Sequence, residues 1–169
     1  MANKTVWITG ASSGIGQEFA RRYAKLGFRL ILTARRKDRL EHLAAELLSQ
    51  YNTLSRILTA DLAQEAECDR LCAEMESERV DIFINNAGFG VCGSFLETDT
   101  ERELSMAKVN VLAMHRLFKF AVKKMEAQGF GTVLNVASSA GLLPGGPYMA
   151  GYYATKAYVV SLTRGVAEE

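Results

Sequence analysis

Apolar residues along the chain form short continuous runs that alternate with longer segments of helical spacing. The run Leu30-Ile31-Leu32 has no polar interruption, which is typical of a strand covered on both faces of a parallel sheet. Between such runs, apolar residues recur every three or four positions, as at Leu40, Leu43 and Leu47. The predicted strands are residues 4–9, 28–34, 54–60, 80–85 and 131–137. The predicted helices are residues 15–26, 39–51, 64–78, 101–128 with a break inside, and 152–166.

This regular alternation of strands and helices predicts an α/β protein with a doubly wound parallel sheet and helices on both faces. No internal repeat and no Pro/Gly-rich linker divides the chain, so residues 1–169 are expected to form a single domain. In the helix at 15–26, the apolar residues Ile15, Phe19, Tyr23 and Leu26 fall on one face.

Composition and charge exclude several classes of protein. Apolar residues make up 49% of the chain, which is enough for a core and excludes a disordered chain. Twenty basic and nineteen acidic residues are mixed along the sequence, so neither a nucleic-acid nor a membrane partner is expected. No apolar stretch approaches the roughly 18 residues of a membrane span. Residues 1–4 lead into the apolar run Thr5-Val6-Trp7-Ile8, which is too short and too soon followed by Gly10 for a signal peptide, and we expect a cytoplasmic protein.

Cysteine and histidine are scarce. The three cysteines are Cys68, Cys72 and Cys92, and the histidines are His42 and His115. Cys68 and Cys72 could share a helix face, but a structural metal needs four ligands close together. We therefore predict no metal site and no disulfide framework, and we interpret the cysteines as ordinary thiols.

Three glycines follow the first predicted strand and open the next helix, at Gly10, Gly14 and Gly16. A glycine-rich turn in this context brings backbone N–H groups and a helix N-terminus to a pyrophosphate, although a plain strand-to-helix turn is the alternative. The second predicted strand ends in cations, Arg35 and Arg36, where an acidic residue would hold the ribose hydroxyls of NAD. A guanidinium pairs well with a 2′-phosphate, so NADP(H) is the preferred cofactor and NAD(H) the second option. A solvated basic loop is the competing interpretation.

Tyr152 and Lys156 stand four positions apart on a predicted helix, and so on one face. A phenol exchanges protons poorly at neutral pH, but a neighbouring ammonium group stabilises the phenolate. Such a pair suits proton exchange with a carbonyl or alcohol oxygen. Taken alone the pair is weak evidence, because similar pairs are common on helix surfaces.

Several motifs in fixed order resemble those of the classical short-chain dehydrogenase/reductase family. They are residues 9–16, residues 85–88, Asn110, Ser138, and the Tyr152/Lys156 pair, and the resemblance runs from about Val6 to Val166. It implies a Rossmann-like fold and an NAD(P)-dependent oxidoreductase that interconverts a carbonyl and an alcohol by hydride transfer. For a full-length protein it also implies a homo-oligomer.

The resemblance further implies a set of cofactor-binding residues. The pyrophosphate and adenosine end would be held by Gly10, Ser12, Ser13, Gly14, Ile15 and Gly16. The 2′-phosphate would be taken by Arg35, with Arg36 beside it, and the adenine by Asp61 and Leu62. The nicotinamide ribose side would be lined by Asn86, Ala87 and Gly88, with Asn85 as a second candidate there or as a polar support of the sheet.

The resemblance also implies a catalytic group. Tyr152 would be the general acid/base, and Lys156 beside it would bind the nicotinamide ribose. Ser138 would hydrogen-bond the reacting oxygen, and Asn110 would hold a water that links Lys156 to solvent. The serine has a competitor. The motif after the strand selects Ser138, whereas counting back from Tyr152 selects Ser139. We prefer Ser138, because the strand end fixes geometry while the loop 143–147 absorbs an extra glycine.

The sequence departs from the family pattern at its end. Family members continue past the helix at 152–166 with further strands and a substrate-covering segment. We therefore expect a truncated domain with an exposed edge at the fifth strand. A non-catalytic dinucleotide-binding module and an inactive fragment remain alternatives to an active enzyme. Apolar candidates for the substrate side are residues 89–93, Leu142, Leu143, Tyr148 and Met149. They predict a small-molecule carbonyl or alcohol of moderate apolarity, or else they pack the core.

Overall fold

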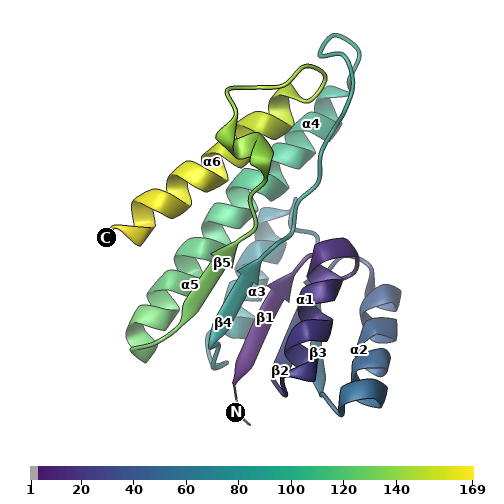
Figure 1. The fold of residues 1–169 in the computed structure, drawn as a ribbon, viewed down its shortest axis with the longest axis vertical. Helices are drawn as coiled ribbons and strands as arrows, with labels where there is room; N and C mark the ends of the chain where they lie inside the picture. Colours follow the sequence, from purple (N-terminus) through teal and green to yellow (C-terminus); the bar gives the residue numbers. More distant parts are fainter. Residues whose placement is uncertain (1–3) are drawn as a thin grey trace.

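The computed structural model describes residues 4–169 as a five-stranded parallel sheet with helices on both faces (Figure 1). Residues 1–3 lie outside the described residues, and the apolar run judged too short for a signal peptide, residues 5–8, lies in the first strand. The strands are β1 (Thr5–Thr9), β2 (Arg29–Ala34), β3 (Ser55–Thr59), β4 (Ile82–Asn85) and β5 (Thr132–Asn135). Their order across the sheet is β3-β2-β1-β4-β5. The predicted α/β, doubly wound architecture is confirmed.

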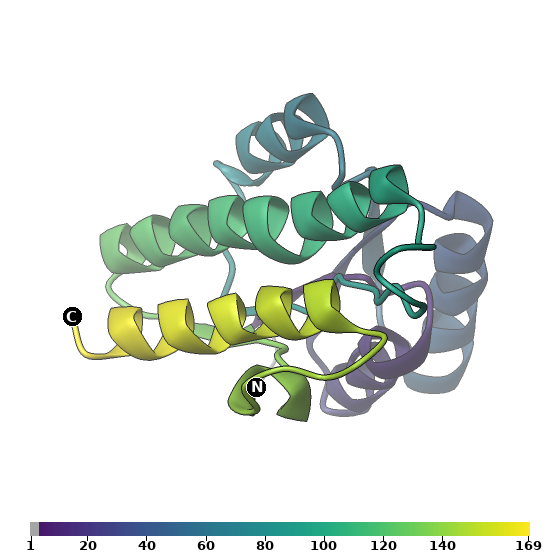
Figure 2. The same ribbon diagram turned by 90° about the horizontal axis from the view of Figure 1, so that it is seen from above.

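Six α-helices and two shorter helical segments connect and cover these strands (Figures 1 and 2). The α-helices are α1 (Gly14–Lys25), α2 (Lys37–Tyr51), α3 (Glu65–Met75), α4 (Thr100–Ala107), α5 (Met114–Gln128) and α6 (Ala150–Ala167). A π-helix, Lys108–Ala113, joins α4 to α5, and a 3₁₀ helix, Ser139–Leu142, follows β5. One core lies between the sheet and helices α1 and α2, and another lies between the sheet and helices α3 and α5.

Strand β1 explains why the apolar runs are continuous rather than alternating. Val6 and Ile8 enter the core under α1 and α2, whereas Trp7 between them enters the opposite core. Helices thus cover both faces of β1, while its two edges pair with β2 and β4. The same argument holds for β2, whose residues 30–34 are all buried.

The apolar face of α1 is only partly buried. Ile15 and Leu26 are 59% and 56% exposed, and the buried residues of α1 are Gly16, Ala20 and Ala24. The reason is that α1 lies very close to the glycine-rich turn at Gly10. A Cβ at Gly16 would lie 2.4 Å from the Gly10 carbonyl oxygen, so only a residue without a side chain fits there. Small residues bring α1 close to the sheet, and the larger side chains are displaced to its flanks.

The predicted break in the long helical region 101–128 is the π-helix Lys108–Ala113. Asp99 starts α4 by accepting a hydrogen bond from the Glu101 N–H at 2.9 Å. A π-helix has one extra residue in the turn and is frequent at functional sites. Asn110 lies in this segment and is buried.

Strand β5 forms one edge of the sheet. Within residues 4–169 it pairs with β4 alone, and Thr132 and Leu134 are exposed. The expected exposed edge at the fifth strand is therefore present in this part of the chain. None of the helices in residues 4–169 has both the length and the apolarity that a membrane crossing requires.

Candidate functional site

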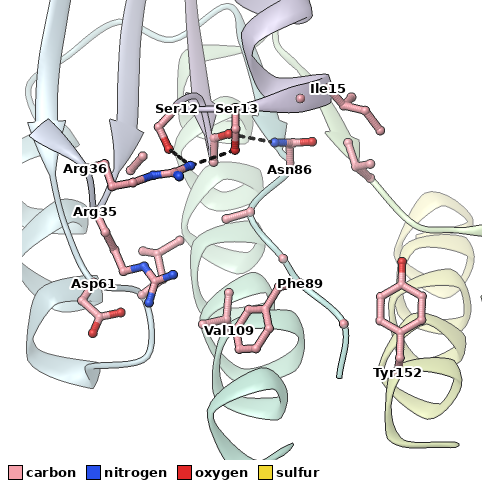
Figure 3. A pocket seen from close by; sticks show the side chains of 18 of the residues that line it. Ser12, Ser13, Ile15, Arg35, Arg36, Asp61, Asn86, Phe89, Val109 and Tyr152 are labelled. Carbon is pink, nitrogen blue, oxygen red and sulfur yellow. Dashed lines mark hydrogen bonds between the residues drawn. The ribbon is translucent and has the colours of Figure 1, made fainter. Parts of the chain in front are cut away.

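A cleft opens at the carboxyl ends of β1 and β4, where the strand order reverses direction (Figure 3). In open α/β sheets this switch point is where ligands bind. The cleft has a volume of about 810 Å³, within the range of small-molecule sites. Fourteen of the residues selected from the sequence line it: Gly10, Ser12, Ser13, Gly14, Ile15, Arg35, Arg36, Asp61, Leu62, Asn86, Ala87, Gly88, Tyr152 and Lys156.

The glycine-rich turn forms one end of this cleft. Gly10 has φ +67°, and a Cβ there would lie 2.8 Å from Asn86 Nδ2 and 2.9 Å from Ala87 Cα. Helix α1 begins at Gly14, and the Ser13 side chain makes no capping bond within the described chain. Backbone N–H groups of the first turn of α1 are thus free to meet an anion. Gly16 does not line the cleft but lies beneath the turn, against Gly10.

Thr9 fixes the neighbouring segment after β4, a role that the sequence analysis missed. Its Oγ1 accepts hydrogen bonds from the N–H groups of Asn86 and Ala87 at 3.0 and 3.1 Å. Asn86 Nδ2 in turn donates to the Thr9 carbonyl oxygen at 2.9 Å. The signal in the sequence is a threonine at the last position of a buried strand, directly before the glycine turn.

Two guanidinium groups follow β2. Arg36 Nη2 donates to Ser12 Oγ at 3.0 Å and to Ser13 Oγ at 2.9 Å. Arg35 lies on the Asp61 side of the cleft (Figure 3). No carboxylate occurs among residues 33–37. This end of the cleft therefore combines cations with hydroxyl groups, a donor set that suits a phosphate.

Tyr152 and Lys156 lie on the same side of α6 and form the other end of the cleft. The Lys156 side chain is 6% exposed, its Nζ donates to the Val136 carbonyl oxygen at 2.9 Å, and it lies 5.9 Å from the centre of the Tyr152 ring. Burial lowers the pKa of this ammonium group below its ordinary value of 10.5. Figure 3 shows Tyr152 across the cleft from the two arginines. The two side chains therefore share one side of the helix, as their spacing predicts, and their role as an acid/base pair stays a prediction.

Asn110 lies behind the cleft rather than in its lining. Its Oδ1 accepts from the Phe89 N–H at 3.0 Å, and its Nδ2 donates to the Phe89 carbonyl oxygen at 2.8 Å. A third bond joins Nδ2 to Thr155 Oγ1 at 3.1 Å. The π-helix is thereby connected to both the segment after β4 and α6.

Ser138, like Gly16 and Asn110, is a predicted site residue that does not line the cleft. Its Oγ accepts from the Ala140 N–H at 3.2 Å and so starts the 3₁₀ helix. It is half-buried and Ser139 is exposed, while the residue before them, Ala137, does line the cleft. The choice between the two serines remains a prediction.

The structure places Asn85 in the sheet, and it places the apolar substrate-side candidates variously in the cleft, in the core and on the surface. Asn85 is buried and donates to the Met114 carbonyl oxygen and to Asn135 Oδ1, at 2.9 and 3.1 Å, so it supports the sheet. Phe89, Gly90 and Met149 line the cleft near Tyr152. Val91 is buried in the core, whereas Cys92, Leu142, Leu143 and Tyr148 are exposed.

The cysteines show the features of ordinary thiols. Burial raises the pKa of the Cys72 thiol to about 11 and also raises that of Cys68, so both resist ionisation. Cys92 is exposed and free. Among the described residues, no group of three or more His, Cys, Asp or Glu side chains could hold a metal ion.

Comparison with known proteins places this geometry in a family. A family model described as short chain dehydrogenase matches residues 4–169. A short-chain dehydrogenase from Sphingobium yanoikuyae in complex with NADPH superposes with a TM-score of 0.91 at 36% identity, over 97% of this chain and 64% of that one. The bulky-bulky ketone specific alcohol dehydrogenase from Comamonas testosteroni also gives 0.91, at 32% identity, over 98% of this chain and 67% of that one.

Curated sequences agree. A very-long-chain 3-oxoacyl-CoA reductase from Podospora anserina is 34% identical over 173 residues, which cover 98% of this chain and 51% of the reductase. The chain spans about half the length of the first curated relatives that it matches. The fold, the glycine-rich turn, the Tyr152/Lys156 pair and the match over residues 4–169 all agree, and the chain belongs to the short-chain dehydrogenase family.

Proposed function

We propose that residues 1–169 form a single NADP(H)-binding domain of an oxidoreductase that interconverts a carbonyl and an alcohol. One observation carries this proposal. A single cleft joins a glycine-rich turn with two arginines at one end to the Tyr152/Lys156 pair at the other. The first end suits a phosphorylated dinucleotide, and the second suits a group that gains or loses a proton.

The residues present fit NADP(H). Gly10 leaves no room for a side chain, so the backbone can approach a pyrophosphate, and the first turn of α1 offers N–H groups to it. Arg36 is held by the two serine hydroxyls, and with Arg35 it would bind a 2′-phosphate. Asp61 and Leu62 line the same end, where the adenine would lie. The NADPH-bound relative from Sphingobium yanoikuyae supports this choice over NAD(H).

At the other end, the side chains of α6 would handle the proton. When bound, NADPH supplies the hydride for the carbonyl carbon. Tyr152 would donate a proton to the carbonyl oxygen, and the ammonium group of Lys156 would stabilise the phenolate that remains. Lys156 would also bind the nicotinamide ribose beside Asn86, Ala87 and Gly88. Ser138 would hydrogen-bond the reacting oxygen, and Asn110 would hold a water that links Lys156 to solvent.

The substrate that fits this site best is a carbonyl compound of moderate apolarity. Phe89, Gly90 and Met149 line the cleft beside Tyr152 and carry no charge. A charged substrate would find no partner among these three side chains. Two relatives support an apolar substrate, since their names specify bulky ketones and very-long-chain 3-oxoacyl-CoA. For the full-length protein we propose a homo-oligomer, because Leu112 and Tyr158 are exposed on neighbouring helical segments.

The experiment is a titration of the chain with NADPH and NADH, followed by ketone reduction with acetophenone in the wild type and two variants. We expect NADPH to bind at least about tenfold tighter than NADH, a difference of about 1.4 kcal/mol. Tyr152→Phe is expected to keep NADPH binding and lose turnover. Tyr158→Phe removes a hydroxyl of the same helix that bonds His115 on the outside, and it should retain wild-type rates.

Wild-type turnover in Tyr152→Phe would contradict the proposed mechanism. Tight NADPH binding without reduction of acetophenone or larger aryl ketones by the wild type would favour the non-catalytic dinucleotide-binding alternative. Absence of binding to either dinucleotide would favour an inactive fragment.

A further inference from the structure

We propose that Thr155 is a positioning residue that holds Asn110, and through Asn110 the backbone at residues 88–89, in register with the Tyr152/Lys156 face of α6. This inference rests on the proposed function and extends it to a residue that the mechanism above does not use. Thr155 lies between the two members of the pair, but its side chain does not line the cleft.

The Thr155 hydroxyl has a defined role in two hydrogen bonds. It donates to the Tyr152 carbonyl oxygen at 2.8 Å, within its own helix. With its hydrogen used there, its lone pair accepts from Asn110 Nδ2 at 3.1 Å. The residue is 6% exposed, so water is a poor substitute for either partner.

The orientation of the Asn110 amide is fixed by backbone groups that cannot exchange roles. The Phe89 N–H can only donate, so it faces Oδ1, and the Phe89 carbonyl oxygen can only accept, so it faces Nδ2. The second N–H of Nδ2 then points at Thr155 and has no other partner in the described residues. Because Asn110 is 2% exposed, losing the hydroxyl would leave a buried donor unpaired.

Asn110 passes this constraint to the catalytic end of the cleft. A Cβ at Gly88 would lie 3.0 Å from Asn110 Oδ1 and 3.6 Å from Lys156 Nζ, so these three groups are packed together. If the Asn110 amide rotates toward another acceptor, its hydrogen bonds to the Phe89 backbone break. The segment 88–89, which faces Lys156, then shifts. Within the described residues, the bond from Asn110 to Thr155 is the one side-chain hydrogen bond between the π-helix and α6, and it would be lost.

The adenosine end of the cleft is held by different contacts. Arg36 is fixed by Ser12 and Ser13, and the glycine turn lies against the Thr9 and Asn86 pair. None of these bonds involves Thr155 or Asn110. Loss of the Thr155 hydroxyl should therefore weaken function at the nicotinamide end and leave the adenosine end intact, a division that general destabilisation would not produce.

The test compares Thr155→Val, Thr155→Ala and Thr155→Ser in the 169-residue chain. The matched control is Thr53→Val, which removes another buried threonine hydroxyl, bonded to the Ala24 carbonyl oxygen at 3.2 Å and distant from the cleft. Three quantities are measured: the affinity for 2′-phospho-ADP, the affinity for NADPH, and kcat for acetophenone as a function of pH. The first ligand lacks both the nicotinamide and its ribose, so it reports the adenosine end alone.

We expect Thr155→Val to lower kcat by about tenfold, which corresponds to about 1.4 kcal/mol, and to change the pH at which the rate is half-maximal. Its affinity for 2′-phospho-ADP should match the wild type. Thr155→Ser should restore the wild-type rate and pH profile, because it keeps the hydroxyl. Thr53→Val should lower the free energy of unfolding and leave all three quantities unchanged.

The inference is overturned if Thr155→Val retains the wild-type rate and profile, or if it weakens both ligands equally. It is also overturned if Thr155→Ser is as defective as Thr155→Ala, since the methyl group and not the hydroxyl would then matter. If Thr155→Val fails to fold, the comparison of Thr155→Ser with Thr155→Ala decides whether the hydroxyl matters. A wild-type chain that neither binds NADPH nor reduces ketones contradicts the proposed function itself, an outcome visible before any variant is examined.

Discussion

Replacing Gly16 with alanine adds one methyl group at the point where α1 lies against the turn at Gly10. The backbone of Gly16 has ordinary helical geometry, so the substitution introduces no strain in φ. In an open helix position the same change is favourable by up to about 1 kcal/mol, because alanine loses less conformational entropy than glycine. The sign of the effect is therefore decided by the space around the new methyl group.

That space is absent. The methyl carbon would lie 2.4 Å from the Gly10 carbonyl oxygen and 2.7 Å from Asn86 Nδ2, whereas ordinary contact begins at 3.4 Å. Helix and turn must separate by about 1 Å, and the turn is itself tied to Ala87. Overpacking of this kind costs about 1–3 kcal/mol. After the gain in helix propensity, we expect Gly16→Ala to lower the free energy of unfolding by about 1–2 kcal/mol, with NADPH affinity falling by about tenfold.

Gly165→Ala is the matched control, since Gly165 is also helical, in α6, and a Cβ there would meet no atom within 4 Å. It should raise the free energy of unfolding by about 0.5 kcal/mol. Urea unfolding of both variants, read from the midpoint at constant slope, gives the comparison. A Gly16→Ala variant as stable as the wild type and with its NADPH affinity would refute the close approach of α1 to the turn.

Three further changes test other parts of the structure. Lys156→Met removes a buried charge whose pKa is lowered by desolvation, so it should abolish ketone reduction and, by relieving that desolvation, raise the free energy of unfolding at pH 7. Between the lowered pKa and 10.5 the unfolded wild type binds more protons than the folded one, so wild-type stability rises with pH and the advantage of methionine shrinks by pH 10 in urea titrations. Asn85→Leu leaves Asn135 Oδ1 without its donor and should lower the free energy of unfolding by about 1–3 kcal/mol, as measured by thermal unfolding. A loss below about 0.5 kcal/mol would contradict this account. Thr33→Val removes the acceptor of the Trp7 indole N–H and should lower the free energy of unfolding by about 1–2 kcal/mol. Urea unfolding can be followed by the fluorescence of Trp7, the single tryptophan, and an unchanged midpoint would show that the bond contributes nothing.

Much of the fold could be predicted because its physical basis is local. A strand such as Leu30-Ile31-Leu32 is buried on both sides, and its composition records that burial directly. The Tyr152/Lys156 pair could be placed on one face because four residues make about one helical turn. The break before α5 could be expected, but its form as a π-helix could not.

The remaining errors and omissions concern contacts between distant segments. The apolar spacing of α1 did not identify its buried residues, because a glycine is required at position 16 by its closeness to Gly10, which hydropathy does not record. Thr9 and Thr155 each join segments more than 40 residues apart, and a threonine in the sequence gives no sign of such a partner. The count back from Tyr152 to the serine crosses the loop 143–147, so the sequence left Ser138 and Ser139 as candidates, and the structure places neither in the lining of the cleft.

Strand β1 is paired on its two edges with strands that enter the sheet at very different times during synthesis. Its partner in β2 lies 24 residues along the chain, as at Thr5 and Arg29, whereas its partner in β4 lies 76 residues along, as at Val6 and Ile82. Closing the longer loop is the slower event, since contacts distant in sequence cost more chain entropy before they form. A nascent chain can therefore assemble β1, β2 and β3 with the glycine turn well before the opposite wall of the cleft exists. Until β4 docks, one edge of β1 is an open template for another strand, and this interval is when the newly made chain is most exposed to aggregation.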